Sequence, residues 1–287
     1  MNGPVDSAAW RRGLAQAGRR RPELDLRAER RGAHTVLTAQ FVTYPFHLTR
    51  PFRLDPLRPE VATLYMQSAS GGLYADEDLN AAVAVGPGAA LHLTTQASTM
   101  VLGPAGKTAR MRVRLAVGAG GFLAYGPDPL ILFPGSAPDT ELAVDLAPGA
   151  GAVLNDGFLL HDPQGLGAAP QSFRSVTEVR IGGRPILVDR QRVAGADLAA
   201  PGGPLNGYRV AGSALLLGLG AALSPEALGE RLGASGVLAG VTALPAGCGL
   251  GVRVLAHDGA SFQTAMTAVF AAAFTARFGV EPTPRRK

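Results

Sequence analysis

The chain has 287 residues, 47% of them hydrophobic, which suffices for a large buried core and excludes a disordered protein. Its 38 glycines and 22 prolines, with only 6% aromatic residues, favour short strands and turns over long helices. The formal net charge of +5 comes almost wholly from arginine, and a single cysteine, Cys248, excludes a disulfide framework and a cysteine zinc cluster.

Residues 1–32 are rich in arginine and are expected to form a disordered leader. Basic segments of this kind bind nucleic acids or anionic lipids in some proteins. Here the arginines are interleaved with Glu23, Asp25 and Glu29, and Trp10 is the one aromatic residue among them. The pattern favours a solvated segment, and neither a nucleic acid nor a membrane is expected as a partner.

Residues 33–205 are predicted to form a β body. It opens with the alternating residues 35–48, which end at Pro45 and Pro51, and continues with the apolar residues 61–66.

A unit of strand, glycine turn and strand then recurs at steps of about 30 residues, in 83–97, 114–128 and 143–157. Residues 180–187 look like a fourth, degenerate copy. We therefore predict a mainly β fold of stacked β-hairpins that resembles a β-helix or solenoid. An antiparallel sandwich, which also contains several glycine turns, is the alternative.

Residues 206–287 are predicted to form a C-terminal part with two helices packed on the body. A loop rich in glycine and proline, 195–207, precedes it. Ser224 as a cap and Pro225 at the first helical position predict a short helix over 224–232. The alanine-rich residues 261–278 carry large apolar side chains near helical spacing and predict the second helix.

Motifs for catalysis are incomplete. The segment 103–108 imitates the end of a phosphate-binding loop, but Val101 stands where that motif needs glycine, so we interpret the segment as a hairpin loop. The five histidines show no metal-ligand spacing, and no Gly-x-Ser-x-Gly nucleophile motif occurs. The sequence therefore predicts a protein that is not an enzyme.

The apolar stretches 211–223 and 237–255 are too short, or too interrupted by Pro245 and glycines, to cross a bilayer. The first residues lack the apolar core of a secretory signal. A soluble cytoplasmic protein is expected.

Several motifs between residues 36 and 193 occur in an order typical of one family. They are Tyr44-Pro45 with 50–54, Gly71-Gly72-Leu73, 85–89 leading into 93–97, Pro127-Asp128-Pro129 with 131–135, and 173–175 through 177–179 to 187–190. Together they resemble the urease accessory protein D family, UreD or UreH.

This resemblance implies a cytoplasmic scaffold with a β-helix-like fold and two helices. Such a protein binds apo-urease and joins the F accessory protein and the GTPase accessory protein G, while the E metallochaperone delivers nickel. It implies no permanently bound cofactor, only nickel in transit. Structural or partner-surface roles are expected for the motif residues Gly71, Gly72, Gly86, Gly88, Thr94, Thr95, Gln96, Phe173 and Arg174.

Two hypotheses follow from this resemblance. In the first, interior acids relay nickel through weak, exchangeable contacts, and the candidates are Glu77, Asp78, Glu178 and Asp189. In the second, the chain is a purely structural adaptor without metal passage. A β-helical carbohydrate-active enzyme, which would need paired carboxylates in a groove, is a weaker third possibility.

Overall fold

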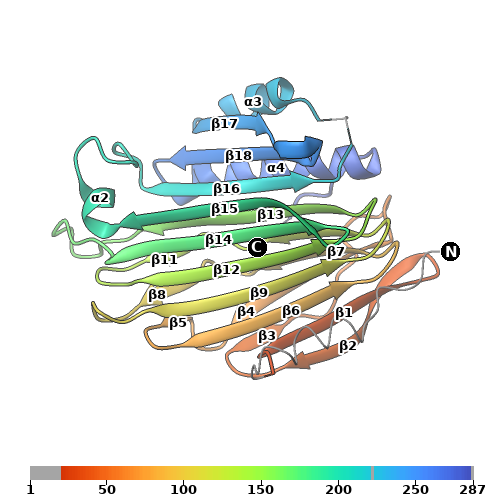
Figure 1. The fold of residues 1–287 in the computed structure, drawn as a ribbon, viewed down its shortest axis with the longest axis horizontal. Helices are drawn as coiled ribbons and strands as arrows, with labels where there is room; N and C mark the ends of the chain where they lie inside the picture. Colours follow the sequence, from red (N-terminus) through yellow and green to blue (C-terminus); the bar gives the residue numbers. More distant parts are fainter. Residues whose placement is uncertain (1–20, 221–222, 286–287) are drawn as a thin grey trace.

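The computed structural model describes residues 21–220 and 223–285. Figure 1 shows two large sheets that face each other, with helix α4 against the outer side of one of them. The first, sheet A, has the strand order β15 (Arg184–Ala194), β14 (Ser172–Ile181), β12 (Pro138–Leu146), β9 (Ala109–Val117), β6 (Asp78–Val85), β1 (Leu24–Arg31) and β2 (His34–Val42).

The second, sheet B, has the order β17 (Leu238–Ala243), β18 (Gly249–Ala256), β16 (Val210–Leu217), β13 (Gly151–Leu160), β10 (Phe122–Gly126), β7 (Ala90–Thr95), β4 (Val61–Ser68) and β3 (Phe46–Leu48). A short row at its side contains β5 (Gly72–Tyr74), β8 (Met100–Leu102) and β11 (Leu130–Leu132), which pairs with the end of β13.

The recurring units are coils of a solenoid, which confirms the predicted architecture. Strands β6, β9, β12 and β14 pair in parallel within sheet A, and β4, β7, β10 and β13 do so within sheet B. The two strands of one unit therefore lie in opposite sheets and form an arch, where we expected each unit to be a paired hairpin. All residues of β7 are buried, as is typical of a parallel strand covered on both faces.

The fourth copy differs from the others because it is a true hairpin. Strands β14 and β15 pair antiparallel around the turn at Gly182 and Gly183, both of which have positive φ. This hairpin ends sheet A, whereas sheet B continues through the antiparallel strands β16, β18 and β17. The parallel coils exclude the antiparallel sandwich alternative for the described residues.

The predicted boundary of the arginine-rich leader at residue 32 is wrong. Leu24, Leu26 and Ala28 are fully buried on β1, which pairs in parallel with β6. The alternation of these apolar residues with charged ones is a strand pattern that the high arginine content obscured. Residues 1–20 of the expected leader lie outside the described residues.

The predicted C-terminal part shares its sheet with the body. Strand β16 pairs with β13 and β18, so sheet B runs across the expected division at 205 and 206. Both expected helices are present, as α3 (Pro225–Gly233), capped by Ser224, and α4 (Gly259–Phe278). A short helix, α2 (Gly195–Ala199), and a 3-10 turn, η1 (Pro245–Gly247), were not expected.

Two apolar layers hold the fold together. Side chains between sheets A and B form the first, and residues of sheet B packed against α3 and α4 form the second. Phe122 and Phe274 are both fully buried in the second layer. Both faces of sheet B are thus covered, which is why its central strands contain few exposed residues.

Leu26→Ala should lower the free energy of unfolding by about 2 to 5 kcal/mol, because it leaves a cavity in the layer between the sheets. Leu166→Ala is the matched control, since Leu166 is 76% exposed and its truncation should change stability by about 0.5 kcal/mol or less. Urea unfolding of both variants measures the difference. Equal effects would show that β1 does not contribute to the core as described.

Candidate functional site between the two sheets

The interior between the two sheets changes from apolar to polar along the strands. In sheet A, the register partners Val144 and Val179 are buried in the apolar core between the sheets. Four positions earlier on the same two strands, the register partners are the polar residues Thr140 and Ser175. The side chains at these positions all point inward because side chains alternate along a strand. Asp156 of β13 faces this polar row from sheet B and accepts a hydrogen bond from the Ser175 hydroxyl.

Asp156 is the central carboxylate of this interior. Burial raises its pKa, although hydrogen bonds from Ser175 and from the backbone of Gly157 act in the opposite direction. Burial and the nearby Asp156 also raise the pKa of Tyr125, so that its phenol stays protonated. The site therefore combines a buried carboxyl group of raised pKa with several hydroxyl groups.

A cavity of about 80 Å³ lies beside Asp156, between the sheets. Polar side chains contribute much of its lining, namely those of Thr95, Thr99, Asp128, Thr140, Asn155, Ser175 and Thr177. The side-chain oxygen of Asn155 is buried and accepts no hydrogen bond within the described residues. An unpaired acceptor beside a carboxylate suits a cavity that receives a cation or a water molecule.

A second cavity of about 200 Å³ lies on the opposite face of sheet B, under α4. It shares Tyr125, Asp128, Asn155 and Asp156 with the first. The strands are interrupted here, because β10 ends at Gly126 and Pro127-Asp128-Pro129 precedes β11. Prolines donate no ladder hydrogen bond, so this segment opens the sheet where the two cavities meet.

Arg285, from the C-terminal segment, contributes to the lining of this second cavity. Arg285 forms a buried ion pair with Asp55 at 2.7 Å, and the backbone nitrogen of Thr283 donates to the same carboxylate at 2.8 Å. The ring of His92 stacks on Phe270 of α4, with centroids 4.6 Å apart. These contacts hold the chain end over the centre of sheet B.

The polar interior reaches the edge of the fold through β15. Ser213 is the register partner of Asp156 on β16, and Gln191 of β15 donates to its hydroxyl at 3.4 Å. Two residues before Gln191 on β15, Asp189 forms an ion pair with Arg253 of β18 at 2.6 Å. The Asp189 side chain is 15% exposed. The row thus runs from the cavity to a charged pair at the edge.

Of the four predicted relay acids, only Asp189 belongs to this interior row. Glu178 lies on the outer face of sheet A, is 39% exposed and pairs with Arg180 at 2.7 Å. Glu77 accepts a hydrogen bond from the backbone of Tyr74 at 2.8 Å within a turn. Asp78 pairs with Arg112 on the outer face. The structure does not bring these four carboxylates together.

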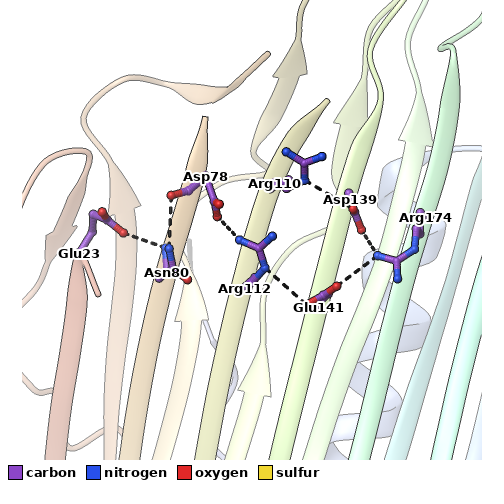
Figure 2. A network of polar contacts seen from close by, with 8 residues as sticks. All are labelled: Glu23, Asp78, Asn80, Arg110, Arg112, Asp139, Glu141 and Arg174. Carbon is purple, nitrogen blue, oxygen red and sulfur yellow. Dashed lines mark hydrogen bonds and ion pairs between the residues drawn. The ribbon is translucent and has the colours of Figure 1, made fainter. Parts of the chain in front are cut away.

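Asp78 belongs to a charged ladder across the outer face of sheet A, shown in Figure 2. Arg112 bridges Asp78 and Glu141, the latter at 3.4 Å, and Arg174 bridges Asp139 and Glu141, the latter at 3.3 Å. Such cross-strand pairs on an exposed face contribute roughly 0 to 1 kcal/mol each. The ladder therefore makes this face polar, and its carboxylates are paired with arginines.

The motif residues contact neighbouring coils. The Thr94 hydroxyl donates to the carbonyl of Gly126 at 2.6 Å, Thr95 accepts from the backbone of Asp128 at 2.9 Å, and Gln67 donates to Gln96.

Close packing explains two further motif positions. Gly72 allows close approach of the Met100 backbone, and Phe173 packs on Phe158 with ring centroids 4.5 Å apart. Gly71 and Gly88 have positive φ in turns, and Gly86 directly follows β6. These contacts are structural, and the expected place of the motif residues at a partner surface stays a prediction.

Sequence reasoning did not identify Asp156, Thr140 and Ser213 as site residues, and it included Ser175 only as part of the motif 173–175. The Pro127-Asp128-Pro129 motif was the available signal in the sequence. Its prolines interrupt the strand at the level where the site lies. Within the described part of the chain, no group of three or more His, Cys, Asp or Glu side chains is arranged to hold a metal ion. The segment 103–108 is a loop that joins β8 to β9, so it does not lead into a helix.

Asp156→Asn should raise the free energy of unfolding relative to wild type, and this gain should grow as the pH increases from about 4 to about 7. A raised pKa in the folded state means that ionisation of Asp156 costs stability above the ordinary carboxyl pKa, and asparagine removes that cost. Urea unfolding at both pH values measures the gain. Glu178→Gln, which removes a carboxylate from the outer face, is the control and should show no such gain, whereas a pH-independent difference for Asp156→Asn would contradict the assignment.

Comparison with known proteins identifies the family. The model of the UreD urease accessory protein family matches residues 20–287. The chain is 42% identical over 271 residues to urease accessory protein UreD 1 of Methylorubrum populi, covering 93% of this chain and 92% of that protein. It is 39% identical to UreD 1 of Bradyrhizobium sp. strain BTAi1, over 92% and 94% of the two chains, and 37% identical to UreD 3 of Bradyrhizobium sp. strain ORS 278 over both full lengths. The chain belongs to the UreD family of urease accessory proteins.

Proposed function

We infer that the protein is a urease maturation scaffold whose polar interior conducts nickel toward apo-urease. Family membership supports a role in urease maturation. The finer steps are our proposal: the chain binds apo-urease, joins the F accessory protein and the GTPase G, and receives nickel that the E metallochaperone delivers. The observation that carries the conduction step is the row of polar side chains that starts at Asp156 and runs between the sheets.

The chemistry of the row suits a cation in transit. A carboxylate, hydroxyl groups and an amide oxygen are oxygen ligands, which hold nickel less firmly than thiolates or grouped imidazoles. Because burial raises its pKa, Asp156 takes up a proton more readily than an exposed carboxyl group does. A cation that enters the cavity favours the carboxylate and releases the proton.

The opening beside Pro127-Asp128-Pro129 supports a route through sheet B. The two cavities share Asp156 and Asn155 at this opening, so a cation moving from one to the other stays within reach of oxygen ligands. Asp189, one of the predicted relay acids, lies at the outer end of the row and is held by Arg253. Partners that bind at either end would control access to the row.

The structural adaptor without metal passage remains the second candidate. The outer-face positions of Asp78 and Glu178 favour it, because three of the four predicted relay acids do not line the interior. The two functions differ in what Asp156 does. If the protein is only an adaptor, asparagine can replace Asp156 without loss of function. If the protein conducts nickel, the carboxylate of Asp156 is required.

Asp156→Asn should lower the nickel content of urease several-fold when the variant replaces wild type in a strain that also produces urease and the F, G and E proteins. Pull-down of the accessory complex, with its protein content measured, should be unchanged. Because the same substitution is expected to stabilise the fold, misfolding does not explain a loss. The readout is nickel per urease active site, measured by plasma mass spectrometry.

Glu178→Gln is the matched control for this experiment, because it removes one carboxylate from the neighbouring sheet without touching the interior. It should leave nickel loading unchanged. Full nickel loading with Asp156→Asn would refute conduction through this row and leave the adaptor function.

A further inference from the structure

A groove lies beyond the edge of sheet A, at the outer end of the polar row, with which it shares Gln191 and Arg253. Sheet A ends at β15, but sheet B extends further through β16, β18 and β17, so part of its inner face has no strand opposite (Figure 1). The groove here has a volume of about 620 Å³. Residues 190–193 of β15 form one wall, and 238–240 of β17 with 253–255 of β18 form the other.

The floor of the groove is apolar and continues the core. Phe158 and Phe173 lie at its base together with Leu198 and Leu205, all of them buried. Leu238, on the wall formed by β17, is 55% exposed. A large apolar side chain that stays exposed next to a buried apolar cluster marks a surface that a partner can cover.

Strand β15 offers backbone groups to such a partner. Within the described residues it pairs with β14 on one side only, so its other edge carries free amide and carbonyl groups. Arg190 and Arg192 lie on this strand, and neither has an ionic or hydrogen-bonding partner in the described part of the chain. Their positive charges repel a second copy of the same edge and attract a strand that carries carboxylates.

The side-chain directions define the sequence of that strand. Arg190 and Arg192 are register partners of Val176 and Arg174, which lie on the outer face of sheet A. Gln191 and Val193 alternate with them and point inward. A strand added to β15 would therefore present acidic side chains outward to the two arginines and apolar side chains inward to the groove.

We propose that the groove beside β15 binds an extended segment of a partner protein in which acidic and apolar residues alternate, and that the segment adds to sheet A as a further strand. Residues 190–193 accommodate about four residues of such a segment, roughly 13 Å at the rise of a β-strand. Backbone hydrogen bonds supply affinity, while the arginines and the apolar floor supply specificity.

The test uses short fluorescein-labelled peptides and the purified full-length chain, with fluorescence anisotropy as the readout. The probe alternates glutamate with valine, and a second peptide has lysine in place of each glutamate. We expect the acidic peptide to bind, the lysine peptide to bind about tenfold more weakly or worse, and added salt to weaken the acidic peptide. An acidic peptide with N-methylated backbone at every second residue tests strand addition, since it cannot pair along one edge.

The variant Arg190→Glu with Arg192→Glu should weaken binding of the acidic peptide at least about tenfold. Its matched control is Arg184→Glu with Arg50→Glu, which makes the same charge change at exposed positions outside the groove. Circular dichroism verifies that both variants fold. Equal binding of acidic and lysine peptides, full binding by the double variant, or concentration-dependent dimerisation through this edge by light scattering would overturn the proposal. The experiment uses neither urease nor nickel, so its failure would leave the proposed function standing.

Discussion

Parallel stacking of successive coils is the constraint on which the rest of the structure depends. Because each strand pairs in register with the equivalent strand of the next coil, equivalent residues form continuous rows between the sheets. The row of Val83, Leu115, Val144 and Val179 is apolar throughout and holds the sheets together. The row four positions earlier ends in Thr140 and Ser175 opposite Asp156, so the same repeat that builds the core also builds a polar path.

Burying the polar row costs stability, and the hydrogen bonds and ion pair of its residues reduce that cost. Burial of the Asp156 carboxylate disfavours its ionised form, and the hydrogen bond from the Ser175 hydroxyl offsets part of that cost. The charged pair of Asp189 and Arg253 stands at the edge, where solvent reduces the cost of desolvation. The interruption at Pro127-Asp128-Pro129 then gives the same carboxylate contact with cavities on both faces of sheet B.

Much of the architecture was predictable from residues alone. The glycine turns repeat at a step that indicates stacked coils, and the Ser224-Pro225 pair marks the start of a helix that the structure contains. The predictions of site residues failed where a shift of one position along a strand decides whether a side chain points inward or outward. Thr177 and Glu178 are neighbours, yet one points inward and the other outward, and no composition or motif reveals which. Strand β1 was missed because its charged positions, taken alone, are typical of a disordered tail.

Nickel content of urease is the measurement that tests the central claim most directly. It compares urease matured with wild type, with Asp156→Asn and with Asp156→Glu, each at equal amounts of accessory complex. Conduction through the polar row predicts little nickel with asparagine and partial recovery with glutamate, because glutamate restores the carboxylate in a slightly different place. Equal nickel in all three would contradict the account and assign the interior a structural role alone.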